Sequence, residues 1–187
     1  PIEAQMPGSR ILVTGATGGV GSIAISLLAK RGFKVTASTG KPSSTDYLTS
    51  LGASEVIDRS TLSEPGKPLA KERWAAAVDT LGGNTLANAC SSIKYGGIVA
   101  AGGLAQSLDF PASVAPFILR GVTLAGIDSV QCPREKRMRA WQQLARDVDM
   151  LELSQIETEI GLSDVIDAAT KLSKGLLHGR LVVDVHR

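Results

Sequence analysis

Residues 13–21 read VTGATGGVG and lie between a short apolar run and a pattern typical of a helix. The run at residues 10–14 (RILVT) predicts a buried strand, and residues 19–31 carry apolar side chains at helical spacing. Glycines between a strand and a helix permit a tight turn and let the backbone approach a pyrophosphate closely. The free amides at the start of the helix, with the positive end of its dipole, would then bind the phosphates. The stretch therefore predicts a phosphate-binding loop.

Two glycine patterns fit this loop. Read as AxGxxG over residues 16–21, it is the dinucleotide-binding fingerprint with alanine in first place. Read as TGxxxGxG over residues 14–21, it is the pattern of short-chain dehydrogenases, which also need a Tyr-x-x-x-Lys pair to supply an acid. Neither Tyr47 nor Tyr95 has a lysine four residues further on. An atypical short-chain dehydrogenase remains an alternative, but one without its catalytic centre.

Short apolar runs alternate with helical patterns along most of the chain. Strands are expected at residues 34–38, 55–57, 75–79, 97–101 and 122–127, helices at residues 43–51, 84–92 and 134–149, and a loop at residues 59–73. This alternation predicts parallel βαβ units with right-handed crossovers. Six such strands indicate an α/β, doubly wound parallel six-stranded sheet, the Rossmann fold.

The end of the chain follows a different pattern. Residues 156–160 and 181–185 look like strands on either side of a helix at residues 163–173, and the six-strand count has no place for them. They pair either with each other or with something absent from this chain. We therefore expect a dinucleotide-binding Rossmann domain at residues 1–150 and a strand-helix-strand tail at residues 151–187.

The end of the second strand predicts the kind of cofactor. A free ribose 2′-hydroxyl is normally held by an Asp or Glu about 20 residues beyond the glycines, but residues 37–41 read ASTGK, with no carboxylate. Hydroxyls and the ammonium of Lys41 would instead donate to the 2′-phosphate of NADP(H). Arg59, just after the third strand, could stack on the adenine or pair with that phosphate. The competing interpretation is that both cations are ordinary surface charges.

Composition limits the other functions. Of 187 residues, 43% are hydrophobic and 20% charged, and the net charge of +2 is too small to indicate nucleic-acid or membrane partners. The basic residues 134–139 are interpreted as the solvated face of a helix. Cys90 and Cys132 lack metal-ligand spacing, so we expect no metal and free thiols in a reducing compartment. No apolar run is long enough to span a membrane, and residues 1–10 do not resemble a signal peptide, which favours the cytoplasm.

The chain resembles a known family in several motifs together. These are GATGGVGSIA at 15–24, DYLTSLGA at 46–53, RWAAAVDTLG at 73–82, YGG at 95–97, PFILRGV at 116–122, GIDSV at 126–130 and HGRLV at 178–182. They are similar to the zinc-independent quinone oxidoreductase branch of the medium-chain dehydrogenase/reductase superfamily, and within it to the acryloyl-CoA reductase (NADPH) type.

The resemblance implies roles for single residues of the chain. Loop residues would contact the pyrophosphate, polar residues would hold the 2′-phosphate, residues at the ends of the fifth and sixth strands would border the nicotinamide, and one arginine would approach from the tail. In that order they are Thr17, Gly18, Gly19 and Val20; Thr39, Gly40, Lys41 and Arg59; Leu104, Ile118 and Ser129; and Arg180. No acid or base is assigned, since Asp79 and Asp128 are interpreted as caps of the helices that follow.

The resemblance also implies a larger protein and a reaction. Members of the family are about twice this long, with a substrate domain before the nucleotide-binding part, so we expect a fragment of a longer enzyme whose last segment packs on that domain. The whole enzyme would transfer hydride from NADPH to an α,β-unsaturated thioester such as acryloyl-CoA, or to a quinone. It would form a homodimer through the sheet edge from Val122 to Ile127. A non-catalytic NADPH-sensing module is the other alternative.

Overall fold

Six parallel strands form the centre of the structure, a computed structural model that describes residues 6–187. The first five residues, part of the stretch in which no signal-peptide pattern was found, lie outside the described residues. The strand order is β3-β2-β1-β4-β5-β6, which is the doubly wound dinucleotide-binding order. The predicted fold class is confirmed. The strands are β1 (Arg10–Val13), β2 (Lys34–Thr39), β3 (Ala53–Asp58), β4 (Trp74–Asp79), β5 (Ile93–Ala101) and β6 (Thr123–Gly126).

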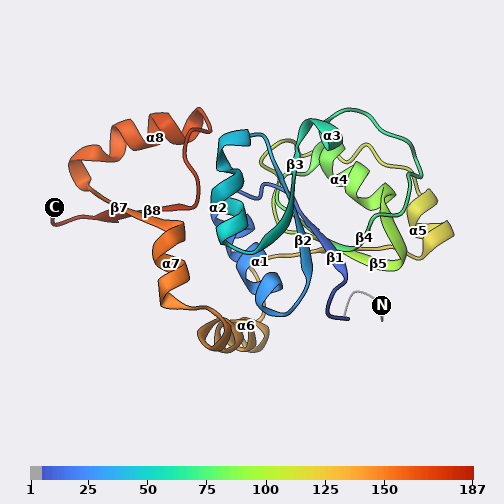
Figure 1. The fold of residues 1–187 in the computed structure, drawn as a ribbon, viewed down its shortest axis with the longest axis horizontal. Helices are drawn as coiled ribbons and strands as arrows, with labels where there is room; N and C mark the ends of the chain where they lie inside the picture. Colours follow the sequence, from blue (N-terminus) through green and yellow to red (C-terminus); the bar gives the residue numbers. More distant parts are fainter. Residues whose placement is uncertain (1–5) are drawn as a thin grey trace.

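Helices cover both faces of this sheet (Figure 1). Consecutive side chains of a strand point to opposite faces, so Leu12 and Val13 of β1 belong to two separate apolar clusters. The cluster around Leu12 includes side chains of the third, fourth and fifth helices, and the cluster around Val13 includes those of the first two. These helices are α1 (Gly19–Lys30), α2 (Thr45–Ser50), α3 (Ser60–Ser63), α4 (Gly83–Ser91) and α5 (Ala115–Arg120), followed by α6 (Arg134–Asp147).

The structure differs from the sequence expectations at three short helices. α3 lies within the predicted loop at residues 59–73, and neither α5 nor α7 (Met150–Ile156) was predicted. Each has at most seven residues, which is too short for a clear 3.6-residue periodicity. Ile156 was predicted to begin a strand. It instead ends α7 and is buried in the Val13 cluster, which ties the tail to the main sheet.

The two strands of the tail pair with each other. β7 (Glu157–Gly161) and β8 (Arg180–Asp184) form a separate parallel two-stranded sheet, so one of the two expected pairings is confirmed. α8 (Val165–Ser173) connects them, and Figure 1 shows this unit beside α1 and α2, at the opposite side of the molecule from α5. Two single turns of 3₁₀ helix, Pro42–Ser44 and Leu162–Asp164, complete the elements. Within residues 6–187, no helix is long and apolar enough to cross a membrane.

One buried carboxylate joins the ends of β1 and β4. Asp79 accepts a hydrogen bond of 2.6 Å from the Thr14 hydroxyl and bonds of 3.2 and 2.8 Å from the amides of Leu81 and Gly82. Burial raises the pKa of Asp79, and the hydrogen bonds from Thr14 and the two amides oppose that shift. Asp79 therefore holds the turn before α4, but Gly82, not Asp79, occupies the N-cap position, so the predicted helix-capping role is wrong.

Asp128 is the exposed counterpart of Asp79. It accepts from the amides of Val130 and Gln131 in the loop after β6, and these bonds lower the pKa of its carboxyl. The N-cap of α6 is Pro133, so Asp128 does not cap a helix either.

Replacing Asp79 by alanine would leave three buried donors without their acceptor. We expect Asp79→Ala to lower the free energy of unfolding by about 2–4 kcal/mol, since buried unsatisfied donors keep their full desolvation cost. The matched control is Asp128→Ala, whose exposed amides can bond to water and which should cost less than about 1 kcal/mol. Urea unfolding of both variants measures the difference. Equal losses would contradict the role given to the buried network.

Candidate dinucleotide-binding site

A cavity of about 560 Å³ opens at the carboxyl ends of β1, β2 and β4. It lies where the strand order reverses, which is where ligands bind in doubly wound sheets, and its volume falls in the range of ligand sites. Its wall has parts from the loop after β1, the ends of β2 and β4, and the tail. The lining residues are Gly15, Thr17, Gly18, Ser38, Thr39, Gly40, Lys41, Arg59, Thr80, Leu81, Ala105, Leu172, Lys174, Gly175, Leu176 and Leu177.

The loop between β1 and α1 offers free donors to this cavity. α1 begins at Gly19, its N-cap Gly18 has an extended backbone without a side-chain cap, and its first turn carries no acidic residue. The amides of Gly19 and Val20 have no acceptor among the described residues. Because the dipole places partial positive charge at this end of the helix, the loop can bind an anion such as a pyrophosphate.

Two glycines shape the loop. Gly15 has a φ of 56°, in the left-handed region that side chains avoid. A Cβ at Gly21 would lie 2.4 Å from the carbonyl oxygen of Gly15 and 2.8 Å from the Cα of Ala16, so α1 packs directly on the loop. Gly18 differs, because the nearest atom to its Cβ would be the Gly15 carbonyl oxygen at 3.3 Å, which is a tight contact but not an overlap.

Two cations lie at the end of β2. Arg59 crosses Gly40 so closely that a Cβ there would be 2.4 Å from the Arg59 Nε. The ammonium of Lys41 donates to the carbonyl oxygen of Leu177 in the tail, and its amide donates to the Thr39 hydroxyl at 3.1 Å. Burial and the nearby Arg59 guanidinium lower the pKa of Lys41. No carboxylate is among the residues that line the cavity. This end of the site therefore favours an added anionic group.

Ser38 is a lining residue that the sequence analysis did not select. It is fully buried at the end of β2, and its hydroxyl is the one buried side-chain polar atom in residues 6–187 without a hydrogen-bond partner. A buried hydroxyl normally has a partner. A ligand with hydroxyl or phosphate oxygens would supply one, so the residues present fit a nucleotide. The polar stretch at residues 37–41 places Ser38 at the end of β2. The sequence does not tell whether its hydroxyl faces the cavity or the core.

Arg180 and the residues before it reach the phosphate loop from the tail. The amide of Gly179 donates to the carbonyl of Thr17 at 2.8 Å, and Gly18 and Gly179 form an isolated parallel bridge. A Cβ at Gly19 would lie 2.9 Å from the Arg180 Nη2, so the guanidinium lies directly over the loop. The structure thus brings together residues that are about 160 positions apart in the chain.

The three residues predicted to border the nicotinamide do not all lie together. Leu104 and Ser129 follow the carboxyl ends of β5 and β6, which are neighbouring strands, and both are exposed. Ile118 lies on α5, whose Arg120 donates to the carbonyls of Ser91 and Ile93 at the amino end of β5. Ile118 therefore lies at the opposite end of the sheet from Leu104 and Ser129 of the same chain. Its predicted position at the carboxyl ends of β5 and β6 is wrong for a single chain.

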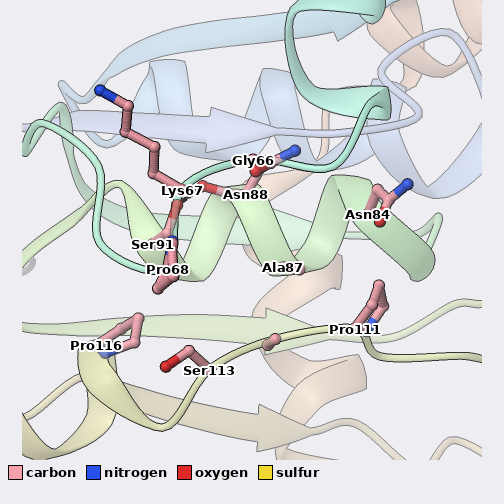
Figure 2. Close-up of a pocket in the computed structure, with 11 residues that line it drawn as sticks. Gly66, Lys67, Pro68, Asn84, Ala87, Asn88, Ser91, Pro111, Ser113 and Pro116 are labelled. Carbon is pink, nitrogen blue, oxygen red and sulfur yellow. Dashed lines mark hydrogen bonds between the residues drawn. The ribbon is translucent and has the colours of Figure 1, made fainter.

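A second cavity, of about 260 Å³, lies apart from this site. Figure 2 shows it between α4 and the segment that leads into α5, with Pro111 and Pro116 on one side and Asn84 and Asn88 on the other. None of the residues predicted to bind a cofactor lines it. The larger cavity is therefore the candidate site.

Fold and site together define a dinucleotide-binding domain, and comparisons with known proteins identify its family. Residues 19–146 match the family model described as zinc-binding dehydrogenase. The chain is 49% identical over 177 residues to the acrylyl-CoA reductase AcuI of Ruegeria pomeroyi, covering 94% of the chain and 54% of the relative. It is 47% identical to the putative quinone oxidoreductase YhfP of Bacillus subtilis, over 92% of the chain and 53% of that relative.

A solved structure agrees with these relatives. The yhdH oxidoreductase from Salmonella enterica in complex with NADP superposes with a TM-score of 0.94 at 40% identity, over 98% of this chain and 57% of that one. The chain therefore belongs to the zinc-binding dehydrogenase family, within the medium-chain dehydrogenase/reductase superfamily, and the predicted resemblance is confirmed. It spans about half the length of the relatives it matches. In residues 6–187 no group of three or more His, Cys, Asp or Glu side chains could hold a metal ion.

Adding one methyl group to the loop tests its packing. We expect Gly21→Ala to destabilise the protein by about 1–3 kcal/mol, because its Cβ would overlap the backbone of residues 15 and 16. Gly126→Ala is the matched control, because Gly126 has no positive φ and no atom would lie within 4 Å of its Cβ, and it should change the free energy of unfolding by less than about 1 kcal/mol. Thermal unfolding of both variants measures this. A stable Gly21→Ala protein would disprove the close packing.

Proposed function

We propose that this chain is the NADPH-binding part of an enzyme that reduces the carbon–carbon double bond of an α,β-unsaturated thioester such as acryloyl-CoA. The observation that carries the cofactor assignment is the cavity end with Lys41 and Arg59 and no lining carboxylate. The Salmonella relative was solved with NADP, and a 49% identical relative is named acrylyl-CoA reductase, which supports both halves of the proposal.

In this proposal each part of the site binds one part of the cofactor. The loop from Thr17 to Val20, which includes Gly18 and Gly19, holds the pyrophosphate with the free amides of Gly19 and Val20, and the Arg180 guanidinium adds a positive charge on its outer side. At the other end, Thr39, Gly40, Lys41 and Arg59 surround the 2′-phosphate. Ionised donors make the stronger hydrogen bonds, so this end supplies the preference over NADH.

The chemistry itself belongs to the bound cofactor, which supplies the hydride for the β-carbon of the thioester. Residues of this chain bind and orient it, with Leu104 and Ser129 bordering the nicotinamide beyond β5 and β6. No side chain of the chain is assigned to deliver the proton to the α-carbon. We assign the proton donor and most of the substrate pocket to a substrate domain that would precede this chain. We also propose that the reaction needs no zinc, as in the family branch that the chain resembles.

The same proposal accounts for the tail. Residues 1–150 form the NADP-binding domain, and residues 151–187 pack on the substrate domain. α8 presents Ile166 to the outside, at 81% exposure, and Val182 and Val183 of β8 are also partly exposed. A two-stranded sheet is only marginally stable by itself, so a covering domain would stabilise it. We assign the enzyme to the cytoplasm, with a small-molecule substrate and neither nucleic acid nor membrane as partner.

A homodimer through β6 would give Ile118 a place at the site. Among the described residues β6 pairs only with β5, so its outer edge is open, and open edges favour pairing. A two-fold axis pairs β6 of one protomer with the same strand of the partner in antiparallel direction. The amino end of β6, with α5 before it, would then lie beside the carboxyl end of the partner's β6. Ile118 would thus border the partner's nicotinamide.

A quinone reductase is the second candidate, favoured by the 47% identity to a protein named as a putative quinone oxidoreductase. A structure of Bacillus subtilis yhfP with NAD bound, 46% identical with a TM-score of 0.88, also makes the choice between NADPH and NADH a necessary test. A non-catalytic NADPH sensor is the third candidate and would bind the cofactor without turnover.

Titration with both cofactors tests the nucleotide assignment. We expect tighter binding of NADPH than of NADH, and the double variant Lys41→Ala/Arg59→Ala should lower the NADPH affinity by at least about 30-fold, since bonds to charged groups contribute roughly 1.5–3 kcal/mol each. NADH affinity should fall far less, and only by what losing the Lys41 bond to the Leu177 carbonyl costs both cofactors. The matched control is Lys136→Ala/Arg139→Ala, two exposed cations of α6 outside the cavity. Isothermal calorimetry measures the affinities of the original protein and both double variants for each cofactor. An equal loss for both cofactors would refute the role of Lys41 and Arg59.

Turnover distinguishes the candidate reactions. The full-length protein should oxidise NADPH when acryloyl-CoA is added, with hydride at the β-carbon, and the 187-residue chain alone should not, because it lacks the substrate pocket. Absorbance of NADPH follows both reactions, with a benzoquinone as the alternative acceptor. Activity with the quinone alone would favour the second candidate. Turnover by the isolated chain would contradict the proposal that the substrate pocket lies in another domain.

A further inference from the structure

The segment from residue 174 to residue 180, here called the strap, crosses the cofactor cavity. Four of its residues line the cavity, and Lys41 holds the carbonyl of Leu177. The next part of the strap carries Gly179, bonded to Thr17, and Arg180, over Gly19. The strap therefore forms one wall of the site and carries the cation assigned to the pyrophosphate.

Two aromatic side chains join the strap to the main sheet. The ring of His178 lies against the ring of Tyr47 from α2, with 4.6 Å between centroids and an interplanar angle of 48°. The Tyr47 hydroxyl donates to the Ser22 hydroxyl at 2.8 Å, and Ser22 in turn donates to the carbonyl of Ala16 at 3.3 Å. Tyr47 thus contacts the strap with its ring and, through Ser22, the phosphate loop with its hydroxyl.

We propose that Tyr47 and His178 are positioning residues, whose ring contact holds the strap over the cavity and thereby places Arg180 at the pyrophosphate. The inference rests on the proposed NADPH binding and adds to it the device that closes the site. Neither side chain is among the residues that line the cavity, so both act through Arg180 and the strap.

The backbone of the strap explains why it needs such an anchor. Gly175 and Gly179 both have a φ of 67°, a conformation that glycine adopts without strain, so the strap has a permissive residue near each end. The side chains of Lys174 and Leu176 are exposed and supply little packing. Because the strap forms one wall of the cavity and carries Arg180, a looser strap would hold a bound cofactor less firmly, so we expect the ring contact to slow its release.

Release of the cofactor is the first measurement. Stopped-flow fluorescence should show that His178→Ala releases NADPH about three- to tenfold faster, the range expected for one lost aromatic pair. His178→Phe keeps a ring and should restore a rate within about twofold of the original. NADH release should change by the same factor, since both cofactors share the pyrophosphate. Tyr95→Leu, at a tyrosine that is 75% exposed on β5, is the matched control and should change neither rate.

A double-mutant cycle separates positioning from a general loss of stability. If His178 acts through Arg180, then Arg180→Ala should weaken NADPH binding strongly in the original protein and clearly less when His178 is already alanine. Independent, additive losses would overturn the proposal. So would a loss of binding in His178→Phe equal to that in His178→Ala.

Hydrogen exchange makes the test independent of the cofactor. The Gly179 amide, bonded to Thr17, should exchange several-fold faster in cofactor-free His178→Ala than in the original protein, while amides of β4 should be unchanged. Unchanged exchange at Gly179 would overturn the proposal. If the original protein binds neither NADPH nor NADH, the proposed function fails, and the exchange result alone then decides whether the ring contact holds the strap.

Discussion

The hydrogen bond from Thr14 to the buried carboxyl of Asp79 joins the ends of β1 and β4. These two strands are neighbours at the point where the strand order of the sheet reverses. β1 and β4 belong to different halves of the doubly wound fold, and a ligand binds in the crevice beyond their carboxyl ends. The position of one strand end relative to the other therefore sets the shape of that crevice. Asp79 accepts hydrogen bonds both from the Thr14 hydroxyl and from two amides of the turn before α4. Burial raises the pKa of this carboxyl, and the three donors oppose that shift only in part. The cavity above it depends on this tie.

Electrostatics then defines what the cavity can hold. Backbone amides at the start of α1 face it on one side and the cations Lys41 and Arg59 on the other, while its lining contains no carboxylate. Such a surface strongly favours a ligand with several phosphates, and the unpartnered Ser38 hydroxyl adds a polar contact in the middle. The site is therefore well formed in a chain that spans only about half of its relatives. In the proposed function, the substrate pocket belongs to a further domain.

The tail contributes both to the cofactor site and to the surface proposed to contact the substrate domain. It contacts the sheet through buried Ile156 and through the strap, yet leaves the apolar side chains of α8 and β8 exposed. One side of the tail thus completes the cofactor site, and the other is available to a substrate domain. Arg180 belongs both to the strap and to the start of β8, so in the proposed enzyme the same short segment would link the cofactor site to the domain contact.

The sequence by itself determined the six strands of the main sheet and the longer helices between and after them, the glycine-rich loop and the acid-free end of β2. Each of these is a local pattern, set by periodicity or by a few adjacent residues such as those at 13–21 and 37–41. Only the tertiary structure decided which distant residues meet. It placed Ile118 at the far end of the sheet, left Ser38 unpartnered in the cavity and brought His178 onto Tyr47. These contacts depend on how helices and tail pack on the sheet, and packing has no signature in local spacing.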